Sequence, residues 1–173
     1  MGRFMVPFGT NPEEYEFTKG VVIVYNTFDG NINELIQKAI QTAEDRKFDK
    51  VLLYPLHEKT SKRMDIEILL GYKQRVKEIE NALLDVLSDV QVEICKLEGK
   101  RSKYTPIDFT LSFISEHHKG PYFLLMPDYI ANKFASYSSF DKWIREVRLM
   151  IFKDYNEILH PKLESNKKRW EWI

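Results

Sequence analysis

Residues 20–33 read GVVIVYNTFDGNIN, a short apolar run followed by a cluster of turn-forming residues. The run at 21–25 is rich in β-branched side chains and has no polar alternation, which is typical of a strand buried on both faces of a parallel sheet. Asp29 and the residues after it break this strand. Asn31 or Asn33 is then predicted to cap a helix whose apolar face continues to residue 43.

A buried strand that turns tightly into a helix is the first half of a βαβ unit. In open α/β sheets, ligands bind outside the carboxyl ends of the strands. The turn after this strand is therefore predicted to form one wall of a ligand site, with the candidate residues Thr27, Phe28, Asp29, Asn31 and Asn33.

Length and charge favour a single α/β domain over residues 1–173, with an irregular N-terminal arm at 1–19 and a C-terminal tail at 153–173. Lys plus Arg and Asp plus Glu both number 26, so the net charge is zero and nothing global predicts binding to nucleic acid or to a membrane. The one cysteine, Cys95, excludes an internal disulfide and fits a reducing compartment. We therefore expect a cytoplasmic protein.

Four further apolar runs are predicted to be strands, at 51–54, 90–95, 122–126 and 149–152. Helical spacing predicts a long helix over 65–87 with Asp65 as its N-cap, and Thr105 and Pro106 are expected to open another helix. Two short helical patterns flank a serine-rich turn at 136–139.

This alternation predicts a Rossmann-like open parallel sheet of about five strands with helices on both faces. The segments at 56–63 and 96–104 are expected to be loops at the carboxyl ends of the second and third strands.

All carboxyl ends of parallel strands meet at one edge of the sheet, so the two loops are predicted to bring their cations together. Seven cations belong to this set: Lys59, Lys62, Arg63, Lys96, Lys100, Arg101 and Lys103. Together with a helix N-terminus they would suit a phosphate-bearing ligand such as a nucleotide. The alternative is that they are ordinary solvated loop charges. His57 and Asp128 end the second and fourth strands at the same edge.

Several segments, in order, resemble the nicotinate-nucleotide adenylyltransferase family within the nucleotidylyltransferases. VVIVYNTFDG resembles the strand and G-G-T-F-D-P opening of that family, and VLLYPLHEKTSKR resembles the segment that ends in P-x-H-K. The helix with Arg75 resembles the R-x-x-M helix. GKRSKYTPIDFTL resembles G-x-S-Y-T-x-D-T, FLLMPDYI resembles the fourth strand with its aspartate, and Lys142-Trp143 resembles a K-W pair.

The resemblance implies the joining of a mononucleotide to ATP, with Mg²⁺ and release of pyrophosphate. It places His57 and Lys59 near the ATP phosphates as catalytic residues. Tyr104 and Thr105 would contact the pyridine nucleotide, Trp143 would lie against its ring, and Asp128 would help to hold the bound nucleotides. The alternative for Trp143 is a place in the hydrophobic core.

The sequence departs from the family at residues that carry the chemistry. An ungapped alignment puts the H-x-G-H motif on Ile32-Asn33-Glu34-Leu35, so both histidines are missing. Tyr25 and Asn26 replace the paired glycines, and the closing S-S-T-x-x-R segment is not visible. Losing one group that stabilises charge in the transition state typically costs about 10²–10³ in rate. We therefore expect adenylyl transfer to be lost or weak.

Three hypotheses follow from these observations. The chain is a nucleotidylyltransferase-like protein that binds a nucleotide or phosphate ligand without turnover, or it is a weak adenylyltransferase that uses His57, Lys59 and a metal. The third hypothesis is a non-enzymatic interaction module with a protein partner or a second copy of the chain. Trp170 and Trp172 would then dock either on the body of the protein or on that partner. No spacing of histidines and cysteines predicts a structural metal site.

Overall fold

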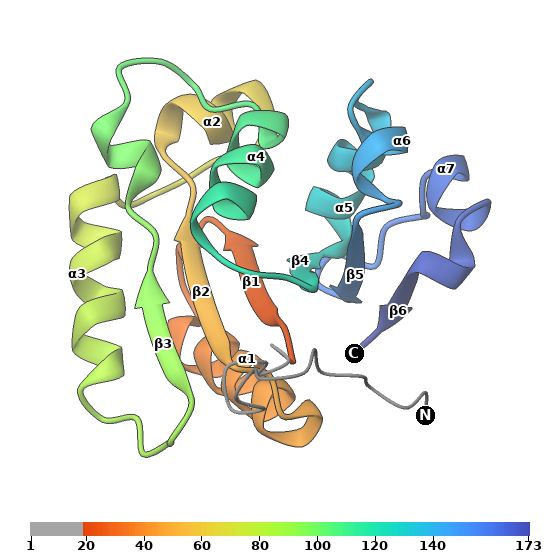
Figure 1. Ribbon diagram of the computed structural model, residues 1–173. Coiled ribbons are helices and arrows are strands. Elements are labelled where there is room, and N and C mark those ends of the chain that lie inside the picture. The colour runs from red at the N-terminus through yellow and green to blue at the C-terminus, as the bar shows by residue number, and fades with distance from the viewer. Residues whose placement is uncertain (1–18) are drawn as a thin grey trace, which may run out of the picture.

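The computed structural model describes residues 19–173, and the predicted arm at 1–18 lies outside the described residues. Six parallel strands form one open sheet in the order β3-β2-β1-β4-β5-β6 (Figure 1). The strands are β1 (Val21–Asn26), β2 (Lys50–Pro55), β3 (Gln91–Ile94), β4 (Tyr122–Pro127), β5 (Val147–Phe152) and β6 (Trp170–Trp172). This arrangement confirms the predicted Rossmann-like α/β fold.

Strand β1 lies at the centre, paired in parallel with β2 on one side and β4 on the other, so that Val22 is opposite both Val51 and Phe123. All six residues of β1 are buried, because helices cover both faces of the sheet there. The order of the strands reverses direction between β1 and β4. In open α/β folds, ligands bind at the carboxyl ends of the strands beside such a reversal.

Helices cover each face of the sheet over a separate hydrophobic core. Helices α1 (Ile32–Arg46) and α3 (Tyr72–Leu83) cover one face. The other face is covered by α4 (Ile107–His117), α5 (Asp128–Ser136), α6 (Phe140–Trp143) and α7 (Pro161–Glu164). Alternate residues of each strand serve the two cores: Ile23 and Tyr25 point to the second, and Val22 and Val24 to the first.

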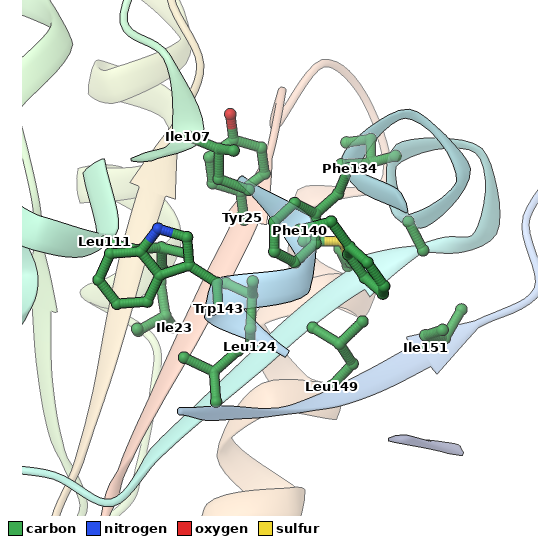
Figure 2. Close-up of a cluster of buried hydrophobic side chains, with 14 of the residues drawn as sticks. Ile23, Tyr25, Ile107, Leu111, Leu124, Phe134, Phe140, Trp143, Leu149 and Ile151 are labelled. Atoms are coloured by element: carbon green, nitrogen blue, oxygen red, sulfur yellow. The ribbon is translucent and has the colours of Figure 1, made fainter. Parts of the chain in front are cut away.

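The core under α4, α5 and α6 contains Trp143, which packs near Leu111 and Leu124 (Figure 2). In the same view Tyr25 stands at the edge of the cluster beside Ile107, with its hydroxyl pointing away from the apolar side chains. Tyr25 therefore marks the end of this core at the carboxyl edge of the sheet.

The long helix predicted over 65–87 is wrong at both ends. Helix α3 begins at Tyr72 after Gly71, and Asp65 has a left-handed backbone with φ of 58° instead of capping a helix. The segment at 65–71 has apolar residues at helical spacing, but its backbone is bound by side chains from elsewhere in the fold. Tertiary contacts thus override the local pattern.

The segment at 56–63 was predicted to be a loop, which is also wrong. It contains the helix α2 (Glu58–Arg63), whose first turn is capped by His57, because Nδ1 of His57 accepts the N–H of Lys59 at 3.2 Å. This helix buries the polar residues Thr60 and Ser61, so it leaves no apolar periodicity in the sequence. The segment at 96–104 likewise contains a short 3₁₀ helix, η2 (Leu97–Lys100).

The tail is more ordered than predicted. After α7, the 3₁₀ helix η3 (Lys167–Arg169) leads into β6, which adds a sixth strand to the edge of the sheet. Trp170 docks on the body of the protein, where it is 7% exposed and donates from Nε1 to the Leu163 carbonyl at 2.7 Å.

Two predicted helix caps make no capping hydrogen bond. Asn31 occupies the N-cap position of α1, but its side chain does not cap the helix, and Asn33 lies inside α1. Helix α4 begins at Ile107, one residue later than the expected start at Pro106. None of the helices within residues 19–173 is long and apolar enough to cross a bilayer.

Candidate functional site

A cavity of about 600 Å³, which we call the rim cavity, opens at the carboxyl end of β1. Its walls come from α2, from the segment that leads into α4, and from the turn between α5 and α6. The lining residues are Tyr25, Thr60, Lys62, Arg63, Met64, Tyr104, Thr105, Pro106, Ile107, Asp108, Tyr137, Ser138 and Ser139. Its place beside the strand reversal is the one that the fold predicts for a ligand.

Hydroxyl groups lie on the lining of the rim cavity. The N–H of Thr105 donates to Oγ1 of Thr60 at 2.9 Å, which fixes the two threonines against each other. Oγ1 of Thr105 itself has no hydrogen-bond partner, although the residue is only 1% exposed. The Tyr25 hydroxyl has a single contact, to the sulfur of Met64 at 3.9 Å. Buried hydroxyls are normally paired, so the Thr105 hydroxyl without a partner is an exception among the groups of this lining.

Cations and aromatic rings lie together on another part of the wall. The guanidinium carbon of Arg63 lies 4.3 Å from the centroid of the Tyr104 ring, and Lys62 precedes it in α2. Asp108 brings one carboxylate to the lining, where it accepts from Nε1 of Trp143 at 2.6 Å and lies 3.8 Å from Nζ of Lys142. Lys62 and Arg63 on this wall are therefore suited to a phosphate or carboxylate.

The two predicted catalytic residues do not line the rim cavity. The ring of His57 serves as the cap of α2 and lies 3.3 Å from the carboxylate of Glu58. Nζ of Lys59 donates to the Ser102 carbonyl at 2.7 Å and so ties α2 to the segment after η2. Both side chains have structural partners, so their catalytic role stays a prediction without support from the geometry.

Three of the predicted turn residues are held in the interior or by other segments. Thr27 is buried, and Phe28 is fully buried in the core under α1 with a left-handed backbone, its N–H donating to Oδ1 of Asn26 at 3.0 Å. The carboxylate of Asp29 accepts the backbone N–H groups of Leu69 and Leu70 at 2.6 and 3.2 Å. The segment at 65–71 is thus fastened over the β1 turn.

Arg75 completes this closure and is 0% exposed. Its guanidinium donates to the carbonyls of Thr27 and Leu56 at 2.5 and 2.6 Å, directly after β1 and β2. It also donates to the Leu70 carbonyl at 2.8 Å and to Oε1 of Glu58 at 3.1 Å. We call this set of four hydrogen bonds the Arg75 clamp. Its hydrogen bonds tie α3 to the carbonyls that directly follow β1 and β2.

Asn31 and Asn33 line a different depression, between the start of α1 and the far half of α3. The carboxylates of Glu34, Glu78 and Asp85 line the same depression, and none of its lining residues is a cation. It therefore does not suit a phosphate, and the structure does not bring the first turn and the basic segments together at one cavity.

The predicted residues of the fourth strand and of α6 also have structural partners. Asp128 is fully buried, and its carboxylate accepts the backbone N–H groups of Tyr129, Tyr155 and Glu157. Trp143 lies in the core rather than on the cavity lining. Of the predicted site residues, only Tyr104 and Thr105 line the rim cavity.

The seven cations of the two basic segments do not all lie at the rim cavity either. Lys62 and Arg63 line the rim cavity, whereas Lys96 pairs with Glu80 on α3 at 3.0 Å and Arg101 stacks on Phe109 at 4.0 Å. A lysine or arginine has a long side chain, so its place in the sequence does not fix where its charge lies.

Sequence reasoning missed Glu98 entirely. It is the one acidic residue in the basic segment 96–104, yet it is buried to 1% exposure beneath α2. The signal in the sequence that could have identified Glu98 is its place as a single carboxylate among many cations.

The ATP and Mg²⁺ that the resemblance implies stay predictions. Within the part of the chain that the structure describes, no group of three or more histidines, cysteines, aspartates or glutamates could hold a metal ion. No step of the proposal below involves a metal.

Comparison with family models and with curated sequences gives no match. Among solved structures, the chain is similar to the Plasmodium falciparum nicotinic acid mononucleotide adenylyltransferase complexed with NaAD, at 12% identity and a TM-score of 0.65. The match covers 89% of this chain and 74% of that one. At this identity the likeness shows the fold, which is a Rossmann-like nucleotidylyltransferase fold.

Proposed function

Starting from this nucleotidylyltransferase-like fold, we propose that the rim cavity binds one phosphate-bearing ligand of mononucleotide size and that the protein does not transfer an adenylyl group. The observation that carries the proposal is the combination of two cations, Lys62 and Arg63, with the unpaired buried hydroxyl of Thr105 in a single cavity. A cluster of charged and polar groups that converge on a cavity is the usual mark of a ligand site.

The size of the rim cavity favours one small ligand. Its volume of about 600 Å³ falls within the range of about 300–1,000 Å³ that is common for small-molecule sites. Tyr104 and Tyr137 supply aromatic faces against which a base or pyridine ring can pack. The hydroxyls of Tyr25 and Thr105 supply donors and acceptors for a ribose or an amide.

The requirements of adenylyl transfer support the proposal that the protein does not carry it out. Two nucleotides must lie in line, with groups that stabilise the charge on the reacting phosphate. The side chains of His57 and Lys59, which the resemblance assigns to the ATP phosphates, have structural partners in this chain. The missing H-x-G-H histidines point in the same direction.

A titration with nicotinate mononucleotide, NAD and ATP tests the binding proposal. We expect nicotinate mononucleotide to bind, and we expect Arg63→Met to weaken that binding about tenfold through loss of one charge-assisted contact. Lys59→Met is the matched control, because it removes one positive charge from the same helix but not from the cavity lining. Absence of binding up to millimolar ligand would leave only the interaction module.

A pyrophosphate-release assay with ATP, Mg²⁺ and nicotinate mononucleotide tests the absence of transfer. We expect no release above background. Release that depends on His57 or Lys59 would instead establish the weak adenylyltransferase.

A further inference from the structure

Glu98 is a buried carboxyl group with an incomplete set of partners. It lies in η2, where Oε1 accepts the backbone N–H of His57 at 2.9 Å and Oε2 has no hydrogen-bond partner. A carboxylate that is 1% exposed loses its hydration, so its charged form is disfavoured.

One layer of side chains separates Glu98 from the rim cavity. Oε1 of Glu98 accepts the N–H of His57, the N-cap of α2, and Thr60 of that helix lines the cavity. The Tyr54 ring stacks on the Tyr25 ring at 5.4 Å between centroids, and Tyr25 lines the cavity as well. Burial and the nearby Glu98 charge raise the pKa values of both tyrosines. A negative charge on Glu98 therefore acts on an anion in the cavity through buried protein groups, which screen it less than water does.

Burial raises the pKa of Glu98, and the interactions with Thr60, His57, Tyr54 and Arg75 oppose this rise without cancelling it. The group is thus placed to change its charge at a higher pH than an exposed glutamate.

The titratable and charged groups that face Glu98 come from five segments: Tyr25 of β1, Tyr54 of β2, His57 before α2, Tyr72 and Arg75 of α3, and Cys95 after β3. Burial raises the pKa values of the three tyrosines and of Cys95, that of Tyr72 to about 12, so they stay neutral near pH 7. Arginine stays charged throughout. Of this set, Glu98 is the group whose loss of a proton is shifted toward neutral pH by burial.

We propose that an anion entering the rim cavity is accompanied by uptake of a proton on Glu98, so that the affinity of the cavity for a phosphate-bearing ligand falls as pH rises. The proposal rests on the proposed function, because it concerns the same cavity. Glu98 touches no ligand and acts through Thr60 and Tyr25.

The direction follows from charge. Above the pH at which Glu98 loses its proton, a carboxylate lies beneath a cavity that receives a second negative charge, and the repulsion weakens binding. Binding in turn favours the protonated form, which is the reciprocal side of the same linkage. An interaction equivalent to one unit of pKa corresponds to about tenfold in affinity.

The experiment is a titration of the wild type and of Glu98→Gln with AMP from about pH 5 to about pH 8. Protonation of the AMP phosphate affects both proteins equally and cancels in the ratio of affinities. We expect the affinity of the wild type relative to that of Glu98→Gln to fall as pH rises, by up to about tenfold. His57→Asn keeps a helix-capping side chain without an imidazole, so it is the control for the histidine beside Glu98 and should behave as the wild type.

A ratio that stays constant over this range, with both proteins binding AMP, would overturn the role of Glu98 and leave the proposed function intact. If neither protein binds AMP, both proposals fail together. Should Glu98→Gln not fold, calorimetry on the His57→Asn protein with adenosine 5′-sulfate, whose charge is fixed, counts the protons taken up. Uptake of part of a proton supports the proposal, and no uptake overturns it.

Discussion

Replacing Arg75 with methionine tests the Arg75 clamp, which ties α3 and the segment at 65–71 to the carboxyl ends of β1 and β2. The substitution keeps an unbranched side chain of similar reach but removes all four hydrogen bonds of the guanidinium. Thr27 and Leu56 are buried, so their carbonyls would lose a donor in a place that water does not reach.

The magnitude follows from these contacts. Leaving each of the two buried carbonyls unpaired costs about 1–3 kcal/mol. Glu58 is partly exposed and regains water, so the loss of its contact adds little. We therefore expect the free energy of unfolding to fall by about 3–5 kcal/mol, or about 10–15 °C in Tm for a chain of this length.

Urea denaturation followed by circular dichroism measures this change, with Lys77→Met as the matched control. Lys77 lies on the exposed side of the same helix, so its replacement should change stability by no more than about 0.5 kcal/mol. If Arg75→Met is as stable as Lys77→Met, the clamp does not hold the segment at 65–71 in place.

Three further outcomes are expected. Thr105→Val should weaken nicotinate mononucleotide binding about tenfold in a titration while leaving the urea midpoint unchanged or higher, because the hydroxyl it removes has no partner in the free protein. Glu98 has a pKa in the folded state above its unfolded value, so the folded state binds more protons. The free energy of unfolding should therefore fall as pH rises from the unfolded pKa through the folded pKa. Urea denaturation over this pH range should show that Glu98→Gln lacks the part of the fall that Glu98 causes. Trp170→Ala should lower stability by about 3–5 kcal/mol, whereas Trp170→Phe should lose little more than the hydrogen bond to Leu163, as thermal denaturation would show.

The sheet could be predicted because its strands carry their own signal. The run VVIVY at 21–25 and the similar runs in β2 and β4 are apolar throughout, since both faces of the sheet are covered. The sixth strand escaped prediction because Trp170–Trp172 is only three residues long and gains its stability from pairing with β5.

The segments around α2 and α3 could not be predicted from local pattern. The residues at 65–71 have helical spacing, but Asp29 and Arg75 bind their backbone from other parts of the chain. Helix α2 is held by its His57 cap and by buried polar side chains. Polar residues give no apolar periodicity, so the sequence of this segment is typical of a loop.

The rim cavity lies at the edge of the sheet where the sequence predicts a ligand site, but most of the candidate residues do not line it. The topology fixes which segments reach the carboxyl edge, and it placed Tyr104 and Thr105 with Lys62 and Arg63. It does not fix on which face of the sheet a turn opens, so Asn31 and Asn33 came to line the acidic depression instead. The partner of each polar side chain is decided by three-dimensional contacts that sequence spacing does not encode.

The most direct test of the account is a map of backbone amide chemical shifts during titration with nicotinate mononucleotide. If the ligand binds in the rim cavity, the largest changes in chemical shift fall on Arg63, Thr105 and Ser139. Asn33 and Glu34, which line the other depression, then change little. Changes centred on Asn33 and Glu34, or no changes up to millimolar ligand, would contradict the account.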